Sequence, residues 1–345
     1  MRAMIRFSFL DLVPVIEGGD VRSALRDAAI IAAHAESVGF HRYWVAEHHG
    51  MPGIASAATS VVLAHVGQAT SSIRIGAGGI MLPNHAPLLI AEQFGTLDAL
   101  FPGRIDLGLG RAPGSDQRVS QAIRRTLTGG PDEFPRDVME LQAYFADDPR
   151  LGIQATPGAG ADVEMWILGS SLYGAQLSAA LGLPYAFASH FAPAALGEAI
   201  AIYRRNFKPS AQLEKPYVMA GYNVFAADSM DEARLIASSM QQVFVRLRTG
   251  QPGKLQPPIA GYYESLPPGA RAMLDDALHA TSIGTKADVE RDIADFIQRT
   301  DVDELIISGQ VYDLNARKRS MEIAMAAAQA VVGRSPAAGS GRPSA

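Results

Sequence analysis

Residues 42–49 of the chain read RYWVAEHH. The apolar residues 43–46 predict a short buried strand, and Glu47, His48 and His49 follow where that strand runs into a loop. In α/β proteins the carboxyl ends of the strands are where catalytic residues gather. Histidine can give or take a proton near neutral pH, so this loop is the first candidate for a catalytic site.

Around this stretch, short apolar runs alternate with longer segments whose apolar residues recur at helical spacing. The runs predict eight strands, at residues 5–10, 42–46, 73–77, 104–109, 163–168, 185–188, 217–226 and 304–308. Helices are predicted between and after them, at residues 21–38, 56–69, 86–100, 132–145, 172–181, 193–206, 229–248, 286–299 and 317–332. Eight βα units in 345 residues predict an α/β fold of the (β/α)8 TIM barrel type.

Two long loops interrupt this alternation, and both are predicted to be insertions at the catalytic face. Residues 112–131, after the fourth strand, are polar and glycine-rich, and residues 249–268, after the seventh, are rich in Pro, Gly and Tyr. Such loops commonly act as lids or binding walls. We expect one barrel domain over residues 1–332 and a disordered tail over residues 333–345, where Gly, Pro, Ser and Ala dominate.

The composition excludes several classes of protein. A net charge of −5 gives no basic surface for nucleic acid. The chain has no cysteine, so it has no disulfide, thiolate nucleophile or cysteine-ligated metal. No apolar segment approaches the length needed to span a membrane, and the amino terminus lacks a signal sequence. We therefore expect a cytoplasmic protein.

Two further strand ends predict an anion site. The run GLGR at residues 108–111 ends a predicted strand, where Gly110 leaves room for a flat ligand and Arg111 suits a phosphate. Gly169-Ser170-Ser171 follows another strand and begins a helix, whose free N–H groups favour anions. The alternatives are a surface ion pair for Arg111 and helix capping for the serines. Together the two ends predict a phosphate clamp and a phosphate-bearing cofactor.

Other polar residues at strand ends give weaker signals. Gly76-Ala77-Gly78-Gly79 serves a strained turn or the close approach of a ligand, and His190 ends the sixth strand. For His85 an outward or capping role is equally expected. Metal binding is not predicted, because no HExxH motif and no repeated His/carboxylate set is present. Adjacent residues on an extended chain point to opposite sides, so only one of His48 and His49 can face the barrel mouth.

Several of these blocks resemble, in order and spacing, the bacterial luciferase-like, flavin-dependent monooxygenases. They are RYWVAEHH at 42–49, AGGIMLP at 77–83, EQF at 92–94, PGRIDLGLGR at 102–111 and LGSS at 168–171. The resemblance covers residues 5–332. The phrases GRAPGSDQ at 110–117 and SHFAP at 189–193 are similar to a bacterial subgroup, the luciferase-like class oxidoreductases.

The resemblance implies a barrel that uses FMN, and it implies roles for individual residues. Arg111 and Ser170 take the places of residues that bind the flavin phosphate, and the Gly78–Gly79 peptide that of a non-prolyl cis bond beneath the flavin ring. Gly110 stands where luciferase has a reactive cysteine, which puts light emission in doubt. The implied cofactor-binding residues are Ala77, Gly78, Gly79, Gly110, Arg111, Gly169, Ser170, Ser171 and Tyr173, and the catalytic candidates are His48 and His190.

The leading hypothesis is therefore a flavin-dependent monooxygenase. Reduced FMN and O2 would form a C4a-peroxyflavin that oxidises a small organic substrate, with His48 as proton donor or acceptor and His190 orienting the ring or the substrate. Glu47 and His49 are expected to brace the turn. The alternatives are an F420-dependent hydride-transfer enzyme of the same fold and a flavin-binding protein without turnover. The chain has no dinucleotide fingerprint, and the resemblance implies a separate NAD(P)H:flavin reductase and a homodimer.

Overall fold

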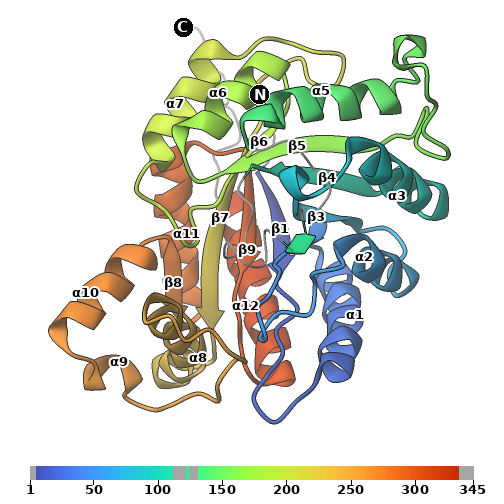
Figure 1. Ribbon diagram of the computed structural model, residues 1–345. Helices are drawn as coiled ribbons and strands as arrows, with labels where there is room; N and C mark the ends of the chain where they lie inside the picture. The colour runs from blue at the N-terminus through green and yellow to red at the C-terminus, as the bar shows by residue number, and fades with distance from the viewer. Residues whose placement is uncertain (1–4, 112–121, 124–130, 334–345) are drawn as a thin grey trace, which may run out of the picture.

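The computed structural model describes residues 5–111, 122–123 and 131–333. Eight parallel strands form a closed barrel (Figure 1): β1 (Arg6–Asp11), β2 (Arg42–Val45), β3 (Arg74–Met81), β4 (Ile105–Gly110), β5 (Glu164–Gly169), β6 (Tyr185–Phe187), β7 (Val218–Ala226) and β9 (Glu304–Ser308). The sheet closes because β6 pairs with β7, and β7 with β9, which in turn pairs with β1. The predicted (β/α)8 TIM barrel is confirmed.

One long helix follows each of these strands and packs outside the barrel. They are α1 (Val21–Val38), α2 (Thr59–Gln68), α3 (Pro87–Leu100), α5 (Phe134–Phe145), α6 (Leu172–Leu181), α7 (Leu196–Asn206), α11 (Lys286–Thr300) and α12 (Leu314–Gly333). Short 3-10 turns are η1 (Leu82–Asn84), η2 (Pro131–Glu133) and η3 (Pro149–Leu151). Local sequence sets the helix ends: α1 begins at an Asp20–Ser23 capping box and ends at Gly39, whose φ is 94°.

The region after β7 differs from the prediction. Helix α8 (Met230–Arg248), predicted as the seventh barrel helix, packs against the end of β7 and the strand that pairs with it, and it also contacts α9 (Tyr262–Ser265) and α10 (Pro268–Ala277) in one insertion, at the lower left of Figure 1. A ninth strand, β8 (Thr281–Gly284), pairs with the last residues of β7. This strand has only four residues, including a serine and a glycine, so it left no apolar run to detect. The barrel helix of this unit is α11.

The insertion lies at the carboxyl end of the barrel, as predicted for residues 249–268. The Leu255 N–H donates to the Val15 carbonyl at 2.9 Å, just beyond the end of β1. The other predicted insertion, residues 112–131, lies outside the described residues except for 122–123 and 131, and so does the predicted tail after residue 333. Within the described part of the chain, no helix combines the length and the apolar character needed to cross a bilayer.

Inward-facing side chains fill the barrel in layers. The middle layer is apolar and includes Trp44, Trp166, Met219 and Ile306. Towards the amino ends of the strands, a buried group of charged residues, here called the amino-end cluster, comprises Arg42, Arg74, Asp106, Glu164 and Glu304. These two layers fill the middle and the amino end of the barrel. Among the described residues, the interior of the barrel can therefore receive a ligand at its carboxyl end.

Candidate active site

One buried carboxylate holds the loop that follows β2. Glu47, with its side chain 1% exposed, places Oε1 at 2.5 Å from His49 Nε2 and at 2.9 Å from His85 Nε2, so both imidazoles donate to it. Its Oε2 accepts from the Met81 N–H at 3.0 Å. Burial alone would raise the pKa of Glu47, but these hydrogen bonds, led by that from His85, outweigh burial and lower it. Glu47 and His49 thus brace the turn, as expected, and tie it to the end of β3.

His48 points away from this bracing group. Along β2 the inward positions alternate with outward ones, and His48 is in phase with the inward-facing Trp44 and Ala46. The His48 side chain is partly buried, and burial lowers its pKa below the ordinary value, although the Glu47 carboxylate opposes this. His48 also contributes to the shift at His190. The two imidazoles therefore face the same barrel mouth.

His190, after the end of β6, lies directly on the backbone of β7. A Cβ added to Gly221 would come within 2.1 Å of His190 Nδ1, so only glycine lets the imidazole sit here. The His190 carbonyl accepts from Asn223 Nδ2 at 2.6 Å. Burial, with a smaller contribution from His48, lowers the pKa of His190 to about 4, so its ring is neutral at pH 7. Its buried Nδ1 lies against the Gly221 backbone and has no hydrogen-bond partner among the described residues.

Arg111, immediately after β4, meets the amino terminus of α6. Its Cζ lies 4.2 Å from the centroid of the Tyr173 ring, in the first turn of α6, and its Nη2 lies 3.3 Å from Asp132 Oδ1. The Asp132 side chain is 97% exposed, so this ion pair is weak. Ser170 and Ser171 are exposed beside Tyr173, and no side chain of a described residue caps the helix. The two halves of the predicted phosphate clamp are in contact.

The glycines of β3 are explained mainly by packing. They lie within the strand, not after it, and the Gly78–Gly79 peptide is cis, as the resemblance implies. A Cβ on Gly78 would lie 2.7 Å from Trp44 Cε3, and one on Gly79 would lie 2.5 Å from the Gly108 carbonyl oxygen. Side chains at both positions are therefore excluded by neighbouring strands. The close approach of a ligand is not needed to account for these glycines.

Gly110 differs from the glycines of β3, because a side chain at this position would have space. Among the described residues, the nearest atom to a Cβ built there would be the Ile80 carbonyl oxygen, at 3.7 Å. Gly169, at the end of β5, is similarly uncrowded, with Gly174 Cα at 3.7 Å. Ala77 is fully buried in the core between barrel and helices, so only its backbone could touch a ligand. Gly110 thus precedes Arg111 at the end of β4, and Gly169 ends the neighbouring β5, between Arg111 and His190 along the barrel rim.

Comparison with known proteins fits this geometry. A family model described as luciferase-like monooxygenase matches residues 5–311. The chain belongs to this family. A luciferase-like monooxygenase of Escherichia coli (strain K12) is 51% identical over 330 residues, covering 95% of this chain and 98% of the relative.

Solved structures of luciferase-like proteins share the fold. The crystal structure of apo-MsnO8 has a TM-score of 0.85 and 30% identity, covering 94% of this chain and 98% of the other. The oxygenating constituent of 3,6-diketocamphane monooxygenase from Pseudomonas putida, a type II Baeyer–Villiger monooxygenase in complex with FMN, has a TM-score of 0.70. Its identity is 17%, with 93% of this chain and 96% of the other covered, so it shows the fold alone.

In this member of the family, the bracing role of His85 was not predicted from the sequence. It lies four residues after the end of β3, next to β2 in the sheet, and that adjacency was the available signal. With Glu47 and His49 it forms a group whose potential metal-ligand atoms lie within 4.8 Å of one another. Hydrogen bonds from both imidazoles to the carboxylate already satisfy this group without an ion.

Proposed function

We propose that this member of the family is an FMN-dependent monooxygenase, which uses reduced FMN and O2 to oxidise a small organic substrate. The observation that carries the proposal is the contact between Arg111 and Tyr173 at the uncapped amino terminus of α6, across the rim from two neutral histidines. Membership of a monooxygenase family and the FMN complex of the diketocamphane enzyme support it. When bound, reduced FMN supplies the electrons that activate O2.

The phosphate of FMN fits the amino terminus of α6. Backbone N–H groups and the positive end of the helix dipole favour a phosphate there, and the Ser170 and Ser171 hydroxyls add donors. Arg111 would add a planar fork of N–H donors, held in place by the Tyr173 ring. From Gly169 towards Gly110 the rim is uncrowded, which leaves room for a flat ring.

The two histidines would handle protons and orientation. Because burial lowers the pKa of both, His48 and His190 are neutral at pH 7 and can accept a proton or share a hydrogen bond. His48 would take a proton from the substrate or return one to the product. His190 would hold the ring or the substrate through the exposed part of its imidazole ring. The insertion containing α8 would help to keep water out of the mouth.

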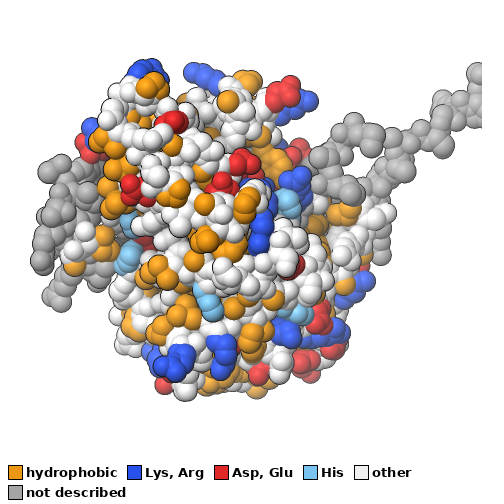
Figure 2. Space-filling view, turned by 90° about the vertical axis from the view of Figure 1, so that its right-hand side faces the viewer, with side chains coloured by type: hydrophobic (Ala, Val, Ile, Leu, Met, Phe, Trp, Pro, Cys, Tyr) orange, Lys and Arg blue, Asp and Glu red, His pale blue; other side chains and the backbone are white. Residues whose placement is uncertain are grey.

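The proposal includes a separate NAD(P)H:flavin reductase, a cytoplasmic location and a homodimer. Figure 2 shows the side of the molecule formed by α1, α2 and α3, where hydrophobic side chains spread over the middle of the face. Val61 of α2 and Leu89 and Leu100 of α3 are each more than half exposed, at 68%, 54% and 53%. An apolar face of this kind is suited to a second copy of the chain. Sedimentation of the wild type and of Val61→Lys tests this: a dimer that becomes monomeric is expected.

Rapid mixing tests the reaction. Protein loaded with photoreduced FMN is mixed with oxygenated buffer, and absorption is followed from the reduced to the oxidised flavin. We expect a transient that delays the return of the oxidised spectrum relative to free FMN. Reoxidation as fast as in free solution, without a transient, would overturn the proposal.

Two simpler measurements separate the alternatives. Fluorescence quenching compares FMN with F420, and stronger binding of F420 would favour a hydride-transfer enzyme. Substrate-dependent consumption of O2 excludes a flavin-binding protein without turnover.

A further inference from the structure

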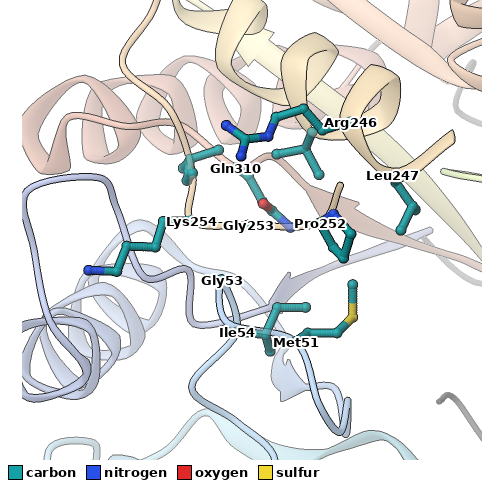
Figure 3. A pocket seen from close by; sticks show the side chains of 11 residues that line it. Met51, Gly53, Ile54, Arg246, Leu247, Pro252, Gly253, Lys254 and Gln310 are labelled. Atoms are coloured by element: carbon teal, nitrogen blue, oxygen red, sulfur yellow. The ribbon is translucent and has the colours of Figure 1, made fainter. Parts of the chain in front are cut away.

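A pocket lies at the carboxyl end of the barrel, between the insertion after β7 and the loop after β2 (Figure 3). The empty space at this pocket is about 440 Å³ when the open solvent in front of it is counted, so the walled part is much smaller and suits a small polar head group. Met51 and Gly53 of its wall lie in the loop that carries His48, and Gln310 lies two residues after the end of β9. The pocket is therefore at the same end of the barrel as the candidate active site, and none of the predicted site residues lines it.

Backbone contacts fix the walls of this pocket. The Val15 N–H donates to the Gly53 carbonyl at 2.9 Å, and Leu255 N–H donates to the Val15 carbonyl at 2.9 Å. A Cβ on Gly53 would lie 2.1 Å from the Gly253 carbonyl oxygen, so the two loops touch backbone to backbone. The pocket thus lies where the loops that carry Val15, Gly53 and Leu255 meet. Residue 53 must be glycine, because the loops are in closest contact there.

The polar groups of the pocket are donors. Arg246, in the last turn of α8, is partly buried, and its Nε donates to the Gln251 carbonyl at 3.2 Å. Arg246 has no carboxylate partner among the described residues. Gln310 is only 6% exposed, and within the described part of the chain its side-chain amide makes no hydrogen bond. Figure 3 shows Arg246 and Gln310 on the same side of the pocket. Lys254, at the rim, donates to the Gly19 carbonyl at 2.7 Å.

The remaining wall is apolar. Met51, Ile54, Val243 and Leu247 line it together with the donors. A guanidinium matches a carboxylate with two parallel hydrogen bonds, and a neighbouring amide can donate a third. Apolar side chains around such a group hold a hydrocarbon chain. The wall composition therefore fits an acid that carries a short apolar chain.

We propose that this pocket binds the carboxylate end of a small organic acid, and that such acids are the substrate class of the enzyme. The second statement rests on the proposed function. Arg246 would pair with the carboxylate and Gln310 would donate to it, while the apolar wall holds the chain. The substrate would then extend from the pocket along the loop of Met51 towards His48.

Calorimetric titration of the full chain, with and without FMN, tests the pocket with hexanoate and its uncharged analogue hexanamide. Hexanoate should bind at least tenfold more tightly than hexanamide. Arg246→Gln should remove most of this preference, and Arg246→Lys should keep part of it, because the charge remains while the planar fork is lost. The matched control is Arg248→Gln, an exposed arginine two residues further along the same helix, which should bind hexanoate like the wild type.

The outcomes separate the two proposals. Equal binding of hexanoate and hexanamide, or equal losses in Arg246→Gln and Arg248→Gln, would overturn the carboxylate pocket, even if FMN binds normally. Hexanoate binding that depends on Arg246 in a protein that fails to bind FMN would overturn the proposed function and leave the pocket standing.

Discussion

The two ends of the barrel differ in how their polar groups are paired, although the same strands form both. At the amino end, the buried Arg42 of β2 contacts three carboxylates, with Nη1 at 2.8 Å from Asp106 and Nε and Nη2 at 3.1 Å from Glu304 and Glu164. At the carboxyl end, the imidazole of His190 is left with an unpartnered nitrogen within the described structure. Removing one partner of a buried ion pair is costly, so the amino end contributes to stability. An unpartnered polar group instead costs stability, and it lies at the end of the barrel where ligands bind.

Removing Arg42 should give the largest effect. Arg42→Met leaves the Asp106, Glu164 and Glu304 carboxylates with Arg74 as the remaining cation of the amino-end cluster, so unfolding should be easier by about 3–5 kcal/mol. Urea unfolding followed by circular dichroism measures this. Arg150→Met, which removes an exposed arginine paired with Asp148, should leave the unfolding midpoint unchanged. Equal midpoints for the two variants would show that the amino-end cluster does not stabilise the barrel.

The unpartnered His190 should make the protein sensitive to acid. Its pKa is about 4 in the folded chain and about 6.5 when unfolded, so only the unfolded state binds a proton between these values. The contribution of neutral His190 to the free energy of unfolding is fully present above pH 6.5. It is lost as the pH falls to 4, by about 3 kcal/mol in total. His190→Asn should therefore lose less stability than the wild type between pH 7 and pH 4. Parallel pH profiles of unfolding free energy would contradict this.

Replacing Arg111 should weaken the binding of FMN and leave the free energy of unfolding unchanged. Loss of a charge-assisted contact of about 1.5–3 kcal/mol predicts that Arg111→Ala binds FMN about 10- to 150-fold more weakly. Arg111→Lys should fall between this variant and the wild type, because lysine keeps the charge but loses the planar stack on Tyr173. Quenching of FMN fluorescence measures the affinities, with Arg136→Ala, 65% exposed on α5, as the control. Equal affinities of wild type and Arg111→Ala would refute the phosphate clamp.

The same contrast explains what the sequence could and could not predict. Local periodicity is enough for the eight barrel strands, and alternation along an extended chain separates His48 from Glu47 and His49. Contacts between distant segments are not encoded in a local pattern. The contacts of α8 with β8, α9 and α10, and the hydrogen bond between His85 and Glu47, therefore cannot be predicted from local periodicity. The need for glycine in β3 likewise becomes clear only from the position of Trp44, which is distant in sequence.

The smallest effect on stability is expected at Gly110, and a matched glycine two residues away sharpens it. A Cβ at Gly108 would lie 2.4 Å from the Ala77 carbonyl oxygen and 2.5 Å from Leu168 Cδ1, so Gly108→Ala should destabilise the protein by about 1–3 kcal/mol. At Gly110 the nearest atom is 3.7 Å away, so Gly110→Ala should change the free energy of unfolding by less than about 0.5 kcal/mol.

If the open space at Gly110 receives the flavin ring, the same variant should still weaken FMN binding by a few-fold, because the added methyl group enters that space. The two measurements together decide the point. Gly110→Ala with unchanged stability and unchanged FMN affinity would mean that the ring lies elsewhere along the rim. A loss of stability as large as that of Gly108→Ala would instead mean that the carboxyl end of β4 is packed as tightly as its middle. Only lost affinity with retained stability keeps the two ends of the barrel distinct in function.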